Sequence, residues 1–372
     1  MSGIKAEAWC DLDRCYRLLS MIPPPPSPAI VATWSFSLAA IESAWISWMA
    51  KDQTDATLIE ALAQACRHAD MDPLVDSVGF GGLPDASGRV SLDGALMLSP
   101  ARFGGVCGLR RHLHPVDVAR LVMERTEHRL LCGEDADDFA DRHGLESSDL
   151  LAAEAREAWQ AWNARPAADA GSAERGLRPV DPGLGTEAGG RLFRPHSGGR
   201  EGAAPAGHDT IGVLARDGTG RLGAACSTSG LPFKVPGRVG DSPIAGHGLF
   251  VDPGVGQAIA TGTGELISGI CAGAVAVETL RRGGTPRDAV VETLQRVEKV
   301  GDLRPHHQVG MIVMDADGQV ASGGFRPGFL IAIRDNDGGR LVEPDLVLRP
   351  DDDGLPESAR DGLAKSVPPP SR

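Results

Sequence analysis

The sequence is poor in positive charge and in aromatic residues. Its 372 residues include 37 Lys and Arg against 50 Asp and Glu, which gives a formal net charge of −13. Because proteins that bind nucleic acid present a positively charged surface, this balance argues against a nucleic-acid partner. Aromatic residues make up only 4% of the chain, whereas glycine occurs 48 times. This composition indicates close backbone packing and many turns.

The sequence also lacks the cysteine spacing of a metal site or a disulfide framework. Its seven cysteines include no CxxC pair and no His/Cys cluster with zinc spacing; they stand at positions 10, 15, 66, 107, 132, 226 and 271. An odd number of scattered cysteines is typical of reduced thiols, although one or two disulfides are also compatible with it. We therefore expect no metal site.

Long apolar runs are missing as well. No run of about 18 apolar residues occurs, so we expect no membrane-spanning helix and no membrane partner. Residues 1–28 carry acidic side chains where a secretory signal would have a basic and then an apolar segment. We therefore expect a cytoplasmic protein, or a periplasmic or secreted one if the assigned start is wrong.

Composition divides the chain into unequal parts. Residues 1–28 end in a proline run, Pro23–Pro26, which is typical of a polyproline-like extension. From about Ala164 to Gly207 the chain consists mainly of Ala, Gly, Pro, Arg and Glu. So long a structureless segment is uncommon inside a compact domain. It is understandable as a flexible tail, 165–207, if the chain is cut just after it. We therefore expect chains 29–209 and 210–372 to form one folded domain.

The regular segments alternate in a way that predicts the fold class. Helical spacing of apolar residues appears at 37–49, 55–67, 115–125, 136–144, 271–282 and 286–300. Strand patterns appear at 30–33, 89–98, 210–215, 222–227, 258–262, 309–314, 320–323 and 328–333. Strands, then helices, then strands predict an α+β fold in which helices cover two sheets, a four-layer αββα sandwich.

One residue at the boundary between the two halves is a candidate nucleophile. Thr210 lies in His208-Asp209-Thr210-Ile211, where the unusual segment ends and a regular strand begins. If the Asp209–Thr210 peptide bond is cut, the new α-amino group of Thr210, a type of group whose pKa is ordinarily about 8, can act as base for its own hydroxyl. Before the cut, the Asp209 carboxylate can deprotonate Thr210 for an N-to-O acyl shift. His208 either supports the turn before cleavage or is an ordinary exposed histidine. For Thr210 itself the alternative is a β-branched residue that starts a strand.

Three further motifs follow Thr210 in a fixed order. They are STSG at 227–230, GRVGDSP at 237–243 and TGTGE at 261–265. Together with HDTIG at 208–212, they resemble the glycosylasparaginases, amidases of the N-terminal-nucleophile hydrolase superfamily. The resemblance runs from about Pro28 to Val347 and is interrupted at 165–207.

The resemblance implies a set of catalytic residues. Thr210 would be the nucleophile, and Thr228 would hydrogen-bond it and tune its reactivity. The hydroxyl of Thr261 and the backbone N–H of Gly262 would form an oxyanion hole for the tetrahedral intermediate. Gly262 would also contact the substrate. The alternatives are a threonine at a strand end for Thr228, and a glycine-rich strand end for Thr261 and Gly262.

The resemblance also implies substrate-binding residues. Arg238 would bind the α-carboxylate of an aspartyl substrate through its bidentate fork, and Asp241 would bind the α-ammonium. A local Arg–Asp ion pair that pins the turn is the structural alternative. Trp34 would wall the pocket, unless it is a core tryptophan, and Ser77 would position the substrate or the loop before cleavage. His247 stands where a small residue is common, so it could narrow the pocket.

The resemblance implies a self-cleaving amidohydrolase. The expected reaction is hydrolysis of the β-amide of N4-(β-N-acetylglucosaminyl)-L-asparagine, a small molecule, or of a related β-aspartyl amide. It would proceed through a β-aspartyl ester on Thr210 and release L-aspartate and the glycosylamine. This chemistry needs no metal or organic cofactor. The resemblance further implies a dimer of αβ heterodimers.

Three other interpretations of the sequence compete with this one. A plant-type L-asparaginase or isoaspartyl peptidase would use the same machinery, but HDTIG and Trp34 favour the glycosylated substrate because that subgroup tends to lack both. An uncleaved, non-enzymatic scaffold is the more distant alternative. A literal GxGxxG at 218–223 does not predict nucleotide binding, because a strand rather than a helix is expected after it.

Overall fold

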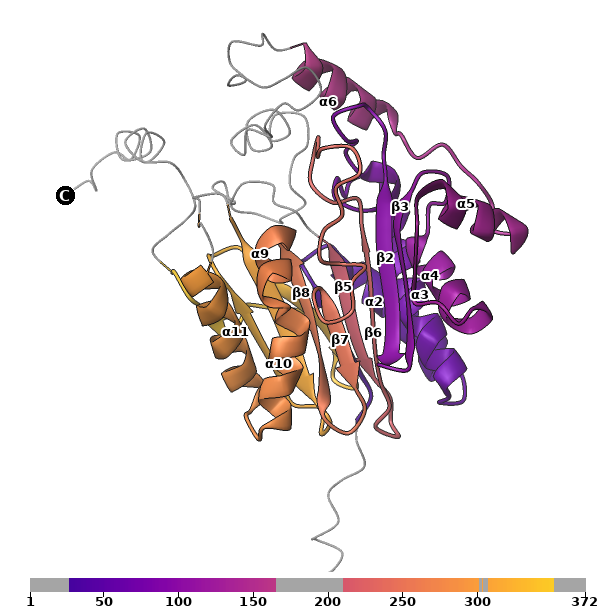
Figure 1. The fold of residues 1–372 in the computed structure, drawn as a ribbon. Helices are drawn as coiled ribbons and strands as arrows, with labels where there is room; N and C mark the ends of the chain where they lie inside the picture. The colour runs from indigo at the N-terminus through magenta and orange to yellow at the C-terminus, as the bar shows by residue number, and fades with distance from the viewer. Residues whose placement is uncertain (1–26, 165–209, 301–302, 304–306, 351–372) are drawn as a thin grey trace, which may run out of the picture.

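The computed structural model describes residues 27–164, 210–300, 303 and 307–350 (Figure 1). The expected extension up to residue 26, the expected tail at 165–207, and His208 and Asp209 lie outside the described residues. Of the helices that are described, none combines the length and the apolar character needed to cross a membrane.

The larger sheet carries both the start and the middle of the chain. Its eight strands run in the order β12-β11-β1-β5-β6-β2-β3-β4, and all neighbours are antiparallel except β3 and β4. In chain order they are β1 (Ala29–Thr33), β2 (Leu92–Ser99), β3 (Arg102–Leu109), β4 (Leu130–Cys132), β5 (Ile211–Arg216), β6 (Leu222–Thr228), β11 (Ile331–Asp335) and β12 (Gly338–Val342). The strand after Thr210 is thus central, between β1 and β6.

The smaller sheet comes entirely from the second half of the chain. Its order is β13-β10-β9-β8-β7, antiparallel except for β10 and β13. The strands are β7 (Leu249–Asp252), β8 (Gly256–Gly262), β9 (Val309–Asp315), β10 (Val320–Gly324) and β13 (Leu346–Val347).

Helices cover the outer face of each sheet (Figure 1). The larger sheet packs against α2 (Ser37–Met49), α3 (Asp55–Asp70) and α4 (Pro115–Arg125), with α5 (Gly133–Arg142) beside β3 and β4. The smaller sheet packs against α10 (Ala272–Arg281) and α11 (Pro286–Val300), and the short α9 (Gly264–Ile270) precedes them. The remaining elements are a 3₁₀ turn at Gly79–Gly81 and α6 (Ala153–Asn163).

Three apolar layers hold this arrangement together. Because side chains alternate between the faces of a strand, Val213 and Ala215 of β5 pack against α2 and α3, whereas Leu214 faces the other sheet. Between the sheets Leu214 joins a cluster that includes Ile259 and Ile312, and a third cluster lies under α10 and α11. The α+β class is confirmed, and an apolar cluster lies between the two sheets while helices pack on their outer faces.

Several local expectations were wrong. Arg102–Leu109 is a strand that the sequence pattern did not predict, because three glycines dilute its β-forming residues. The strand expected at 89–98 is instead Leu92–Ser99, because residues 85–89 form a turn in which the Asp85 N–H donates to the Arg89 carbonyl at 2.8 Å. The helix expected at 136–144 is instead Gly133–Arg142. The helices α6 and α9 and the short strands β4, β7, β12 and β13 were also missed.

Candidate active site

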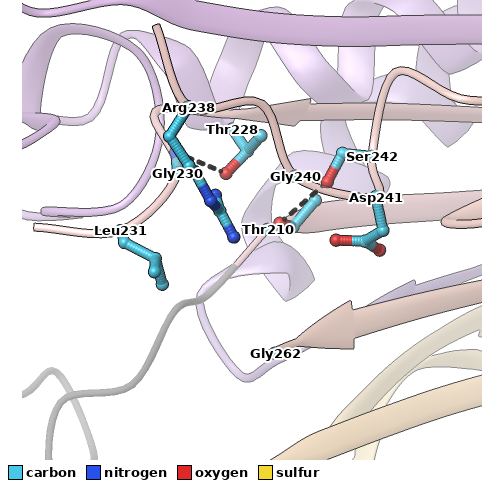
Figure 2. Close-up of a pocket in the computed structure, with 9 residues that line it drawn as sticks. All are labelled: Thr210, Thr228, Gly230, Leu231, Arg238, Gly240, Asp241, Ser242 and Gly262. Atoms are coloured by element: carbon cyan, nitrogen blue, oxygen red, sulfur yellow. Dashed lines mark hydrogen bonds between the residues drawn. The ribbon is translucent and has the colours of Figure 1, made fainter. Parts of the chain in front are cut away.

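The residue expected to be the nucleophile, Thr210, directly precedes β5 and lies in a pocket (Figure 2). The described residues that line it are Thr210, Thr228, Gly230, Leu231, Arg238, Gly240, Asp241, Ser242 and Gly262. Five of the residues singled out in the sequence therefore converge, although they come from the residue before β5, from β6 and β8, and from the loop between β6 and β7.

Thr210 is held at both its main chain and its side chain. Its carbonyl oxygen accepts a hydrogen bond from the Thr33 hydroxyl at 2.7 Å and a longer one from Thr261 at 3.4 Å. The hydroxyl of Thr33 also accepts from the N–H of Gly212 at 2.8 Å. The Thr210 hydroxyl lies 3.2 Å from the hydroxyl of Ser242. Strand β1 thus fixes the backbone of Thr210, and the β6–β7 loop fixes its hydroxyl.

Thr228 lines the same pocket but makes different contacts from those expected. Its hydroxyl donates to the Ser77 carbonyl at 3.4 Å and accepts from the Gly230 N–H at 2.9 Å. Among the described residues, the expected hydrogen bond between Thr228 and Thr210 does not occur, and Ser242 contacts the Thr210 hydroxyl instead. The contribution of Thr228 to reactivity stays a prediction. Ser77 is buried and braces Thr228 through its carbonyl, whereas a contact with substrate stays a prediction.

Trp34, at the end of β1, connects the larger sheet to the expected oxyanion hole. Its φ of 67° lies in the left-handed region, which is uncommon for a bulky residue. The indole Nε1 donates to the Thr261 hydroxyl at 2.9 Å, and the ring packs edge-on against Phe329. At Gly262, with φ of 107°, a Cβ would lie 2.3 Å from the Gln308 carbonyl oxygen, so the position requires glycine.

Arg238 is held in place by an acidic residue from the next motif. Its Nε and Nη2 donate to the two carboxylate oxygens of Glu265 at 2.8 and 3.0 Å. Glycines leave room for the guanidinium: a Cβ at Gly230, Gly240 or Gly264 would lie 3.1, 2.9 or 2.9 Å from one of its nitrogens. Because Glu265 occupies one edge of the guanidinium, the edge that includes Nη1 is left to meet a ligand in the pocket.

Asp241 is a buried carboxylate that forms no ion pair with the residues that the structure describes. Its side chain is only 4% exposed, and within the described chain its Oδ2 has no hydrogen-bond partner. Arg238 forms an ion pair with Glu265, so the structural alternative, an ion pair between Arg238 and Asp241 that pins the turn, does not form among the described residues. Burial raises the pKa of Asp241 to about 7, and the positive charge of Arg238 only partly opposes this. Such a group is stabilised by a cation that enters the pocket.

Sequence reasoning missed a buried lysine behind the pocket. Lys234 is 1% exposed, and its Nζ donates to the carbonyls of Ser229 at 2.9 Å and Ser91 at 3.3 Å. Burial lowers its pKa, against the attraction of the Asp93 carboxylate. A single lysine in a Gly- and Pro-rich loop has no periodicity that would have identified it.

Ser242, Thr33 and Glu265 also received no role from the sequence. Ser242 and Glu265 stand inside the GRVGDSP and TGTGE motifs, so the motifs offered a signal for them. Thr33 precedes Trp34 and had no comparable signal. His247, expected near the pocket, is not among the described residues that line it, and its Nε2 instead lies 3.6 Å from the Cys271 sulfur.

Potential metal ligands do not gather in the part of the chain that the structure describes. No three His, Cys, Asp or Glu side chains there converge on a common point. The functional groups that line the pocket are therefore hydroxyls, one guanidinium, one carboxylate and glycine N–H groups. This set can bind a zwitterion and present a hydroxyl to it.

Comparisons with known proteins identify relatives of this chain. A family model described as asparaginase matches residues 36–341. A protein of Elizabethkingia miricola named N(4)-(Beta-N-acetylglucosaminyl)-L-asparaginase is 34% identical over 326 residues, which cover 87% of this chain and 86% of that protein. Proteins of the same name from Mus musculus and Rattus norvegicus are each 35% identical, over 74% of this chain and 78% of theirs.

Proposed function

The chain belongs to the asparaginase family, and on that premise we propose that it hydrolyses the side-chain amide of N4-(β-N-acetylglucosaminyl)-L-asparagine to L-aspartate and the glycosylamine. The names of its relatives support this substrate. The observation that carries the proposal is the buried carboxylate of Asp241, whose Oδ2 has no partner among the described residues, beside the guanidinium of Arg238 and the hydroxyl of Thr210 in one pocket.

Binding begins at the amino-acid end of the substrate. The α-ammonium pairs with Asp241, whose Oδ2 lacks a partner among the described residues, and the α-carboxylate pairs with the edge of Arg238 that Glu265 does not occupy. An ammonium offsets the cost of burying a bare carboxylate, so binding favours the ionised form of Asp241. The side-chain amide then extends toward Thr210.

The chemical steps use Thr210 as an N-terminal nucleophile. Cleavage before Thr210 frees its α-amine, which takes the proton from the hydroxyl while Oγ1 attacks the amide carbon. The Thr261 hydroxyl and the Gly262 N–H stabilise the resulting oxyanion. The Thr261 hydroxyl accepts a hydrogen bond from the Trp34 indole, which leaves its own proton to be donated. In this structure that proton is donated to the Thr210 carbonyl oxygen, 3.4 Å away.

Collapse of the tetrahedral intermediate completes the first half of the reaction. The carbon–nitrogen bond breaks, the glycosylamine leaves with the proton held by the amine, and a β-aspartyl ester of Thr210 remains. A water then attacks the ester carbon, the same amine accepts its proton, and L-aspartate leaves. The hydroxyl of Thr210 is restored, and no metal or organic cofactor takes part.

Two further features belong to the proposal. The processed protein is a dimer of αβ heterodimers, and it acts in the cytoplasm. Light scattering of the processed protein and fractionation of the source cells would test these two points separately.

The test combines mass spectrometry with a product assay. Intact mass and N-terminal sequencing of fresh protein should show two chains, one beginning at Thr210, and the Thr210→Ala variant should stay a single chain of 38.9 kDa. Aspartate release should be fastest from the glycosylated asparagine, compared with asparagine and β-aspartyl dipeptides. Faster release from the dipeptides would instead support an isoaspartyl peptidase. A wild-type chain that stays whole for days would contradict the nucleophile itself.

A further inference from the structure

Ser242 makes the side-chain contact that the sequence led us to expect of Thr228. Its hydroxyl lies 3.2 Å from that of Thr210, and the two side chains face one another in the pocket (Figure 2). Ser242 is 2% exposed and Thr210 is 5% exposed, so bulk water competes little for this hydrogen bond. Ser242 is the side chain within the described residues to which the Thr210 hydroxyl hydrogen-bonds.

The position of Ser242 is fixed independently of any ligand. The Cys226 thiol of β6 donates to the Ser242 carbonyl at 3.0 Å. Gly248 packs so closely that a Cβ there would lie 2.8 Å from the Ser242 Cα. Pro243 follows and fixes its own φ near −65°. The hydroxyl of Ser242 is therefore presented by a segment with little freedom to move.

The same segment fixes the group that binds the substrate. Asp241 precedes Ser242, and its carbonyl accepts hydrogen bonds from the N–H groups of Ile244 and Gly248, each at 3.1 Å. Neighbouring residues thus present the carboxylate that holds the α-ammonium and the hydroxyl that contacts the nucleophile. This rigid peptide sets the distance between the bound end of the substrate and the reacting oxygen.

We propose that Ser242 is a positioning residue that holds the Thr210 hydroxyl in the rotamer facing the substrate amide carbon, a role that rests on the proposed function of Thr210. A threonine side chain can occupy several staggered rotamers, and a buried partner selects one of them. A serine hydroxyl both accepts and donates. At rest, the Ser242 hydroxyl accepts a hydrogen bond from the Thr210 hydroxyl. As the Thr210 proton moves to the α-amine, the Ser242 hydroxyl turns to donate a hydrogen bond to Oγ1. Ser242 keeps its own proton throughout.

The test compares variants of the full chain at one buried position. In Ser242→Ala we expect kcat per processed molecule to fall about 10- to 100-fold, because a misplaced nucleophile costs this much. KM for the glycosylated asparagine should stay within about twofold, because Arg238 and Asp241 are untouched. Ser242→Thr keeps a hydroxyl and should recover most of kcat. Ser229→Ala is the matched control, because Ser229 is equally buried but its hydroxyl has no partner among the described residues.

Each other outcome is decisive. A kcat for Ser242→Ala within about twofold of wild type would overturn the proposal. So would a rise in KM alongside the fall in kcat, since a collapsed loop would displace the neighbouring Asp241. If Ser242→Ala fails to cleave itself, restoration of cleavage in Ser242→Thr supports the proposal, and no restoration overturns it. If wild-type protein releases no aspartate from any substrate, the proposed function fails. The role of Ser242 is then tested only by comparing the rates of self-cleavage of the wild type, Ser242→Ala and Ser242→Thr.

Discussion

Replacing Asp241 by Asn should stabilise the protein while abolishing its activity. The folded protein above pH 7 carries a buried carboxylate that has no counterion in the described chain. Burial raises the pKa of Asp241 from 3.8 to about 7. At about 1.36 kcal/mol for each tenfold change in proton affinity, ionising this group in the folded state costs about 4 kcal/mol. Asparagine has nearly the same shape and carries no charge, so the variant avoids this cost.

The pH dependence follows from the direction of the pKa shift. Because the folded state binds the proton more tightly, the stabilising contribution of protonated Asp241 is fully present below about pH 4. It is lost as the pH rises to about 7 and stays lost at higher pH. The Asn variant and its parent should therefore unfold at similar temperatures at pH 4. Their difference should then grow to about 8 °C at pH 8, at about 2 °C per kcal/mol for a large domain.

The assay is thermal unfolding across pH 4 to about 9 in a Thr210→Ala background, which should keep the chain in one piece. Asp317→Asn is the matched control, because that aspartate is exposed in the turn between β9 and β10 and its substitution should have no comparable effect. An Asp241→Asn variant that melts at or below its parent at pH 8 would refute the reasoning. A difference that does not change with pH would refute it too. In the cleavable background, the same variant should lose aspartate release because the α-ammonium has no partner.

Three further substitutions test other contacts in the pocket. Gly262→Ala should lower the melting temperature and stop aspartate release, because the new Cβ would approach a carbonyl oxygen to 2.3 Å; a fully active variant would contradict this. Trp34→Phe should lower kcat about tenfold by removing the 2.9 Å hydrogen bond to Thr261, and an unchanged kcat in steady-state assays would exclude that bond from the oxyanion hole. Glu265→Gln should shift the acid limb of kcat/KM to lower pH, because the negative charge of Glu265 helps raise the pKa of Asp241. If the acid limb of the pH profile does not move, the group that titrates there is the α-amine of Thr210 and not Asp241.

The elements with a strong local signal were predictable from the sequence. Ser37–Met49 and Pro115–Arg125 have the predicted bounds, because their apolar residues recur at helical spacing and Pro115 starts the second helix. The strands on either side of the 217–220 turn were also predicted nearly to their ends. The strand Arg102–Leu109 and the short helix Gly264–Ile270 were not, because glycine-rich segments have weak preferences and depend on the elements they pack against.

The sequence by itself determined the family and several of the residues that line the pocket. Thr210 stands where composition changes, and the motifs containing Arg238, Asp241 and Gly262 follow in order, so each could be identified without coordinates. The reason is that both signals are local: a change of composition and a short motif can be seen within a few residues of the chain.

Only the tertiary structure decided which of these groups touch. The antiparallel pairing of β1, β5 and β6 brings Thr33 to the backbone of Thr210. The loop after β6 brings Ser242, rather than Thr228, to its hydroxyl. Glu265, rather than Asp241, pairs with Arg238, which leaves Asp241 buried and unpaired in the described chain. Hydrogen bonds and ion pairs between segments far apart in sequence leave no periodic pattern, so their partners are fixed only when the sheets pack.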